Sequence, residues 1–179
     1  MKEGTHVILL SKRLVKQLSL LCKKIEIAGS IRRKNKEPKD TEILNKTKIS
    51  VSKTFKDKKK KVSDIDIVLI PKNKEKLVEF MKSKGYNYLQ GGEHESTWRV
   101  DGVKVELYYT TTEEWGAELL AYSSKKGSGI GLRIVARLKG FKLNNHGLFD
   151  RKTGKRIAGK TEREIYSALG RKYKEPWER

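Results

Sequence analysis

The chain has 179 residues, enough for one modest domain or for two small lobes that share a core. Its formal net charge is +20 and its pI is near 10.0. This excess of Lys and Arg predicts a polyanionic partner, with nucleic acid ahead of an acidic membrane surface. Adaptation to high temperature enriches Lys and Glu together, and would leave the net charge near zero.

Cysteine usage and hydropathy narrow the class further. Cys22 is the only cysteine, so an internal disulfide is excluded and a reducing compartment is expected. It lies in an apolar run and is expected in the core. The three histidines are scattered, which argues against a structural zinc site. With no long apolar stretch and no signal-peptide pattern, we expect a cytoplasmic or virus-encoded intracellular monomer with no membrane partner.

The first part of the chain predicts a helix and a strand, followed by a long polar excursion. Apolar residues at helical spacing follow Ser11, which is expected to be the N-cap. IEIAGS, residues 25–30, reads as a short strand that ends in small residues. Residues 34–61 are rich in lysine and predict an excursion with one short hairpin, ILN against ISVSK.

From residue 64 onward the pattern alternates more clearly. DIDIVLI predicts a strand, and NKEKLVEFMKSKG a helix that ends at Gly85. YNYLQGGEHESTWRV is expected to form one strand, and VKVELYYT another, joined to it by a turn at Asp101 and Gly102.

The last third predicts three helices and a hairpin. TEEWGAELLAYSS is expected to form a helix with a Thr cap, and GLRIVARLKG a basic helix that ends at Gly140. GLFDRKTGKRIAG predicts a hairpin that turns at Lys152 to Gly154. A final helix has Thr161 and Glu164 at capping-box spacing. The predicted fold class is α+β, with a mixed sheet that helices cover on one side.

Two acidic residues stand inside the strand DIDIVLI. Because side chains alternate along a strand, Asp64 and Asp66 point to one face, and Ile65 and Ile67 point to the other, toward the core. The two carboxylates repel each other unless a cation lies between them, and Mg²⁺ prefers such oxygen ligands. The alternative is an exposed edge strand on which both aspartates are solvated.

A second motif, GSIRR, adds groups that suit phosphate. Gly29 and Ser30 are small, so backbone N–H groups and a hydroxyl can approach an anion closely. Arg32 and Arg33 supply the guanidinium geometry that best matches phosphate. The motif is weak by itself, since such a turn is common on basic surfaces.

VKVELYYT contributes a third acid. Glu106 lies on the face opposite Val105 and Leu107, and would complete a carboxylate cluster if this strand paired with DIDIVLI. Alternatively, Glu106 faces solvent beside Lys104 on an amphipathic strand.

The order of GSIRR, DIDIVLIP, KVELYYT, LLAYSS, GLR, KLNNHGLFD and TEREIYSALG resembles that of the family X DNA polymerases, from about residue 12 to the C-terminus. The tail motifs are the most specific part, because other nucleotidyltransferases share the G-S and D-x-D signature without them. The chain is similar to the minimal, virus-like members that consist of a palm and a C-terminal subdomain. That resemblance implies a palm at residues 1–112, with a lysine-rich insertion at about 38–61, and a nucleotide- and template-binding subdomain at 113–179.

The resemblance also implies a function and a set of site residues. The expected activity is Mg²⁺-dependent, DNA-directed addition of deoxynucleotides to a primer 3′-hydroxyl on gapped or primer-template DNA, with deoxynucleoside triphosphates as substrates. Two Mg²⁺ ions, which Mn²⁺ can replace, would be held by Asp64, Asp66 and Glu106. The nucleotide would contact Gly29, Ser30, Arg33, Tyr122 and Ser123. DNA would contact Lys125, Lys126, Arg133, Arg137 and Lys142.

Spacing leaves a second acidic pair in contention. In the family the D-x-D follows the G-S by roughly ten residues, which fits Asp40 and Glu42 better than Asp64 and Asp66. The later pair stands in a stronger strand that leads directly into a helix, as a palm requires, so we favour it. The Lys56–Lys61 run would then belong to a basic arm near DNA, or to a solvated loop without a partner.

Several positions depart from the family pattern. Glu106 replaces an aspartate and is one methylene longer, which would shift a bound metal. Ala121, Ser123 and Ser124 replace an aromatic residue, Thr and Gly, and Gly129 stands where an Asn commonly touches the nucleotide, so loose sugar discrimination is expected. A template-independent or RNA-type nucleotidyltransferase and a catalytically weakened protein that binds DNA ends therefore remain alternatives.

Overall fold

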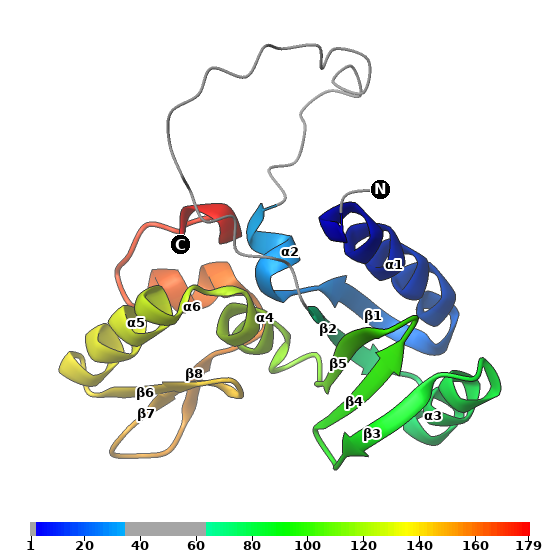
Figure 1. Ribbon diagram of the computed structural model, residues 1–179. Helices are drawn as coiled ribbons and strands as arrows, with labels where there is room; N and C mark the ends of the chain where they lie inside the picture. Colours follow the sequence, from blue (N-terminus) through cyan, green and yellow to red (C-terminus); the bar gives the residue numbers. More distant parts are fainter. Residues whose placement is uncertain (1–2, 35–63) are drawn as a thin grey trace, which may run out of the picture.

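The structure is a computed structural model that describes residues 3–34 and 64–179 (Figure 1). Four sequence-based expectations lie outside the described residues: the 38–61 insertion, its hairpin, the acidic pair Asp40 and Glu42, and the Lys56–Lys61 run.

A five-stranded mixed sheet forms the centre of the N-terminal lobe. Its strand order is β1-β2-β5-β4-β3, in which β2 runs parallel to β5 and the other neighbours are antiparallel. The strands are β1 (Cys22–Ile27), β2 (Asp64–Pro71), β3 (Asn87–Gly91), β4 (Glu95–Val100) and β5 (Val103–Tyr109). The mixed α+β class predicted from the sequence is confirmed.

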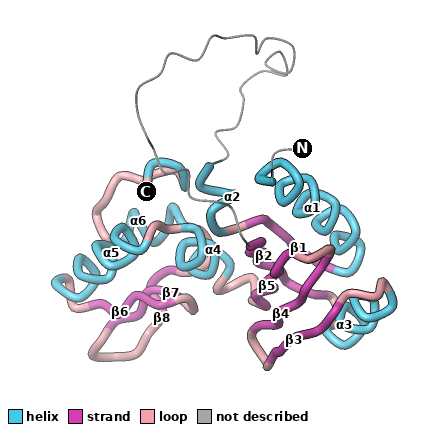
Figure 2. Tube along the Cα trace, in the orientation of Figure 1, coloured by secondary structure: helices cyan, strands magenta, loops and turns pink. Residues whose placement is uncertain are grey.

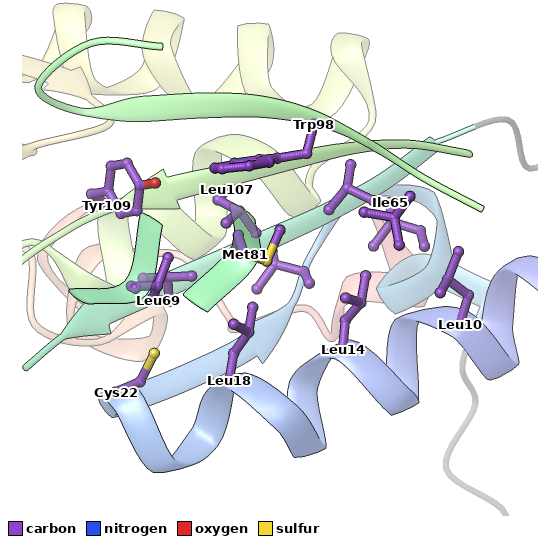
Figure 3. Close-up of a cluster of buried hydrophobic side chains, with 14 of the residues drawn as sticks. Leu10, Leu14, Leu18, Cys22, Ile65, Leu69, Met81, Trp98, Leu107 and Tyr109 are labelled. Atoms are coloured by element: carbon purple, nitrogen blue, oxygen red, sulfur yellow. The ribbon is translucent and has the colours of Figure 1, made fainter. Parts of the chain in front are cut away.

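Helices α1 (Glu3–Leu18) and α3 (Lys74–Ser83) cover one face of this sheet. Leu14 and Leu18 of α1 are fully buried against Ile65 and Leu107 of the central strands, and Trp98 of β4 closes the same core (Figure 3). Burying a Leu or Ile side chain contributes about 1.5–3 kcal/mol, so this layer supplies much of the driving force for folding of the lobe.

Ser11 does not cap α1, contrary to expectation. The helix begins eight residues earlier, at Glu3, and Ser11 is fully buried in its interior, where its hydroxyl donates to the carbonyl of Ile8 at 2.8 Å. A Ser in mid-helix can satisfy its hydroxyl on the preceding turn, so a cap residue type alone does not mark a start. After a 3-10 turn, η1 (Ser19–Leu21), β1 begins at Cys22, which is buried as expected.

The expected strand at residues 86–100 is two strands. β3 ends at Gly91 and pairs antiparallel with β4 through a short turn at residues 92–94. The Gly91-Gly92 pair was the signal for this break. The helix between β2 and β3 ends as predicted, since Lys84 caps it and Gly85 takes a φ of +73°.

The second part of the chain forms a C-terminal lobe, here Trp115–Glu178, in which three helices pack on a small antiparallel sheet (Figure 2). Its elements are α4 (Trp115–Ser123), α5 (Lys126–Leu138), β6 (Phe141–Asn144), β7 (Gly147–Asp150), β8 (Arg156–Ala158), α6 (Glu162–Ala168) and the 3-10 turn η3 (Pro176–Glu178). The β7–β8 hairpin and the Thr161–Glu164 capping box are confirmed. β6 was missed.

Two other predictions for this lobe are corrected. The residue before α4 is Glu114, whose side chain makes no capping hydrogen bond, so the Thr cap is wrong. Helix α5 begins at Lys126 rather than at residue 131, because three glycines in its first two turns hide the helical pattern.

Helix α4 joins the two lobes. Trp115 and Leu119 pack on the second face of the five-stranded sheet, against Val68 and Ile70 of β2, so that sheet is not covered on one side alone. The next face of α4 enters the core of the C-terminal lobe. At Gly116 a Cβ would lie 2.2 Å from the backbone of Thr161, so only glycine permits α6 to start this close to α4.

Candidate active site

The parallel pairing of β2 with β5 brings the predicted acids together. Asp66 lies opposite Glu106 in the register, and Asp64 lies opposite Lys104. The second half of β2 is covered on this face by α4, whereas Asp64 and Asp66 lie in the first half, beyond α4, and are only partly buried. This division explains why a strand that is apolar along its second half opens with two carboxylates.

Asp66 occupies an electrostatically unfavourable position for an anion. Burial, followed by the negative charges of Asp64 and Glu106, raises its pKa to about 6. The Tyr108 hydroxyl donates to Asp66 Oδ1 at 3.4 Å. This hydrogen bond and the positive charge of Arg33 lower the pKa of Asp66, against the stronger effect of burial. A cation near these carboxylates would relieve the repulsion that remains.

The turn Gly29-Ser30 is pressed against Asp66. The strand β1 ends at Ile27, and both residues lie in the first turn of α2 (Gly29–Lys34) rather than at a strand end. Gly29 has a φ of +62°, and a Cβ on it would lie 1.8 Å from Asp66 Oδ2, so no other residue fits here without displacing the carboxylate. The Oγ of Ser30 is buried and has no hydrogen-bond partner in the described part of the chain.

Glu106 is turned toward a lysine. Its Oε1 lies 2.7 Å from Lys104 Nζ, two residues away on the same face of β5. Within residues 3–34 and 64–179, no three side chains of metal-ligand type are arranged as a metal cage. The carboxylates are therefore neighbours in the sheet, but their third member is engaged elsewhere.

Arg32 does not lie where the phosphate interpretation placed it. Its guanidinium donates to both carboxylate oxygens of Glu162, at 2.9 and 2.8 Å, and to Glu26 at 2.8 Å. Arg179 donates to the same Glu162 at 2.7 Å, and both Glu162 and Arg179 are buried. Of the two arginines in GSIRR, only Arg33 remains for a ligand. Sequence carried no signal that separates them, because Glu162, the partner that binds both nitrogens of the Arg32 fork, is 130 residues further along the chain.

Tyr122 and Ser123 have different surroundings. The ring of Tyr122 stacks on Tyr108, with ring centroids 3.6 Å apart and an angle of 19° between the planes. Because Tyr108 also donates to Asp66, the ring of Tyr108 alone separates Tyr122 from that carboxylate. Ser123 is fully buried on α4, and its hydroxyl is enclosed in the interior. Tyr108 was not predicted, although strand alternation puts it on the face of Glu106.

The predicted DNA-contacting residues all belong to α5 and its flanks. Arg133 is exposed and lines a hollow beside α4 together with Ala121, Ser124, Gly129 and Asn144. A Cβ on Gly129 would meet nothing closer than 3.8 Å, so the hollow follows from small side chains. The other predicted contacts are exposed cations, namely Lys125, Lys126, Arg137 and Lys142. No described helix is both long and apolar enough to cross a membrane.

Comparisons with known proteins agree with the tail motifs. The family model for the DNA polymerase beta thumb matches residues 118–179. The repair DNA polymerase X of African swine fever virus is 25% identical over 146 residues, which cover 76% of this chain and 83% of the viral protein. The DNA nucleotidylexotransferase of Gallus gallus is 33% identical over 78 residues, or 43% of this chain. The DNA polymerase IV of Saccharomyces cerevisiae is 34% identical over 73 residues, or 41% of this chain.

The extent of these matches differs among the relatives. The matched segment spans 15% of the length of the chicken protein and 12% of the yeast protein, but most of the viral one. The longer match covers about three quarters of this chain, and the shorter ones fall on less than half of it. Its motifs, its α+β architecture and these matches make the chain similar to the family X DNA polymerases, most clearly over residues 118–179, where the thumb model matches.

Proposed function

We propose that the chain is a Mg²⁺-dependent, DNA-directed DNA polymerase that adds deoxynucleotides to a primer 3′-hydroxyl, and that it fills gaps in DNA repair. The observation that carries this proposal is the position of Gly29, which Ser30 follows, directly against Asp66 on the strand that pairs with β5 and its Glu106. A phosphate-binding turn and a carboxylate cluster that touch each other are what nucleotidyl transfer requires.

The groups at the site have separate roles in this proposal. The backbone of Gly29, the free hydroxyl of Ser30 and the guanidinium of Arg33 would bind the triphosphate and hold its reacting phosphorus near the acids. The ring of Tyr122 would support the sugar. Positioning of this kind and charge neutralisation provide most of the rate enhancement in phosphoryl transfer.

The donor set fits Mg²⁺ in its chemistry. Asp64, Asp66 and Glu106 provide only carboxylate oxygens, which hard divalent cations prefer, and the raised pKa of Asp66 reflects negative charge that lacks compensation. Bound Mg²⁺ would lower the pKa of the primer hydroxyl and neutralise charge on the leaving pyrophosphate. Glu106 would have to leave Lys104 to join the set.

Template-directed synthesis can be tested with a gapped duplex and each deoxynucleoside triphosphate supplied singly. We expect Mg²⁺-dependent incorporation of the nucleotide complementary to the templating base. Incorporation that ignores the template would support a terminal transferase instead. No incorporation by pure, folded protein would contradict both enzymatic assignments.

Template-independent transfer is the second candidate function. It is favoured by the relative named DNA nucleotidylexotransferase, which is 33% identical over 78 residues of the chain. The hollow beside Ala121 and Gly129 is consistent with a loosely defined nucleotide position. A third possibility, a protein that only binds DNA ends, is suggested by the Lys104–Glu106 pair. The single-nucleotide assay separates all three.

Partner and location follow from the proposed activity. Exposed cations on α5 and β6 would contact the phosphates of primer-template DNA, and Arg133 would lie nearest the nucleotide because it lines the hollow beside α4. Since DNA and deoxynucleotides are intracellular substrates, the protein would act inside a cell as a monomer on each primer end.

A further inference from the structure

A groove of about 410 Å³ runs between α5 and the segment that follows α6. Leu132 and Tyr166, both almost fully buried, form part of its floor. Three cations of the segment after α6 line its opposite wall: Arg171, Lys172 and Lys174. We call it the tail groove. Its size is in the range of natural ligand sites.

Every charged side chain that lines the tail groove is positive. None of its three cations forms an ion pair with a carboxylate of residues 64–179 or of the described N-terminal segment, and the nearby Glu175 is paired with Arg163 at 3.2 Å. A second groove of about 450 Å³, between β8 and α6, is lined by both Arg163 and Glu164. Of the two, the tail groove therefore presents an uncompensated positive charge, which attracts a polyanion.

The tail groove and the hollow beside α4 open on different faces of α5, and Leu132 lies between them and lines both. Successive residues of a helix are about 100° apart, so Ser128 and Val135, which line the groove, project roughly opposite to Arg133 and Arg137. Arg133 borders the hollow beside α4. Figure 1 shows the segment after α6 following the outer side of the lobe before it returns, at η3, toward α2. Nucleic acid that Arg133 and Arg137 hold near the carboxylates of β2 and β5 would therefore not make the contacts that line the tail groove.

We propose that the tail groove binds the phosphate backbone of DNA at a distance from the primer terminus. The guanidinium of Arg171 and the ammonium groups of Lys172 and Lys174 would contact successive phosphates, and the Ser128 hydroxyl would donate from the other wall. Such contacts hold DNA without reading its sequence. This inference rests on the proposed function only for the choice of DNA as the polyanion.

The test compares two triple variants that change the net charge equally. One is Arg171→Glu/Lys172→Glu/Lys174→Glu in the groove. The other is Lys12→Glu/Lys16→Glu/Lys76→Glu, on exposed positions of α1 and α3, which cover the opposite face of the sheet from the acids. Binding is measured with a long gapped duplex and with a short duplex that ends close to the primer terminus, over a range of salt concentrations.

For the groove variant we expect affinity for the long duplex to fall by about tenfold or more relative to the control variant. The slope of log affinity against log salt should decrease in magnitude by about 2 to 3 units, because up to three phosphate contacts are lost. Affinity for the short duplex should match that of the control. A milder variant, Arg171→Gln/Lys172→Gln/Lys174→Gln, should show the same effect at about half the size, and guards against misfolding caused by new acids.

Equal binding of the long duplex by the groove and control variants would overturn the proposal, as would an equal loss with both duplexes. The readout is independent of catalysis. If the protein fails to incorporate nucleotides, the binding comparison still decides the role of the groove. If incorporation at saturating DNA is normal and the two variants bind alike, the groove assignment alone is wrong.

Discussion

Gly29 is the single residue on which the geometry of the acids most depends. Gly29→Ala would place a methyl group 1.8 Å from Asp66 Oδ2, on a backbone with a φ of +62°. We expect the rate of nucleotide incorporation to fall by about 100-fold or more, because displacements near 1 Å have that effect on positioned reactions. Single-turnover incorporation measures this directly.

Gly154→Ala is the matched control for Gly29. Gly154 has a φ of +70° and open space where its Cβ would be. It should therefore carry the backbone cost of about 1–2 kcal/mol without the collision, and incorporation should stay within about twofold of the wild type. Equal losses in both variants would mean that backbone strain, and not contact with Asp66, is responsible.

Lys104 competes for the third carboxylate. Lys104→Met should release Glu106, and the Mg²⁺ concentration for half-maximal incorporation should fall by up to about fivefold, the limit that an exposed ion pair of about 0.2–1 kcal/mol permits. Lys76→Met, on an exposed position of α3, should leave it unchanged. A Mg²⁺ requirement that rises in Lys104→Met would show that Lys104 assists the site.

At the scale of elements, α4 buries a carboxyl group between the two lobes. Glu118 is 3% exposed. Burial raises its pKa to about 7, while Asn145 and His146 of the β6–β7 turn lower it and Glu114 and Glu95 raise it. In the unfolded chain Glu118 has the ordinary pKa of a glutamate. The stability that its protonated form contributes to the folded state is therefore complete below that pKa, and it is lost as the pH rises toward 7.

Glu118→Gln removes this titration. Between pH 5 and 8 the free energy of unfolding of the wild type should decline by about 2 kcal/mol more than that of the variant. Urea denaturation at several pH values measures the difference, with Glu79→Gln on the exposed side of α3 as the control. Parallel pH curves for wild type and Glu118→Gln would contradict the account.

The elements also show what sequence pattern can specify. DIDIVLI, the helix before Gly85 and the Thr161 capping box were predicted because each combines periodicity with a terminal signal in a few adjacent residues. The start of α1, the first turns of α5 and strand β6 were missed because tertiary packing, rather than local propensity, stabilises them. The acids and Gly29 could be predicted for the same local reason.

The contacts of Arg32 with Glu162 and of Tyr122 with Tyr108 could not be predicted, since they join separate elements of the fold. Glu162 is about 130 residues from Arg32, and its choice of Arg32 over Arg33 follows from the direction in which α2 leaves the sheet. Lys104 was recognised as a neighbour of Glu106, but whether the two side chains meet depends on the space beside β5.

At the scale of the whole molecule, a buried network ties α2 to the C-terminal lobe. Burial alone would raise the pKa of Glu162, but hydrogen bonds from Arg32 and Arg179 lower it below its ordinary value. A carboxylate of lowered pKa contributes stability at neutral pH that is lost as pH falls through the acidic range. The network thus holds the proposed phosphate turn against the lobe that would carry the nucleotide.

Glu162→Ala would leave the buried guanidinium of Arg179 and the partly buried guanidinium of Arg32 without this partner. We expect the free energy of unfolding to drop by about 3–5 kcal/mol at pH 7, as for other buried pairs that lose one member. Arg163→Ala, which removes an exposed pair with Glu175, should cost at most about 1 kcal/mol. A similar small loss in both variants would show that the network does not join the lobes.

The central claim is that Asp64 and Asp66 carry nucleotidyl transfer. Its most direct test is the single-turnover rate of Mg²⁺-dependent incorporation on a gapped duplex for Asp64→Asn, Asp66→Asn and Asp40→Asn. We expect loss of incorporation in the first two variants, with DNA binding retained, and a near wild-type rate in Asp40→Asn. Incorporation that survives in Asp64→Asn and Asp66→Asn but vanishes in Asp40→Asn would move the chemistry to the earlier acidic pair.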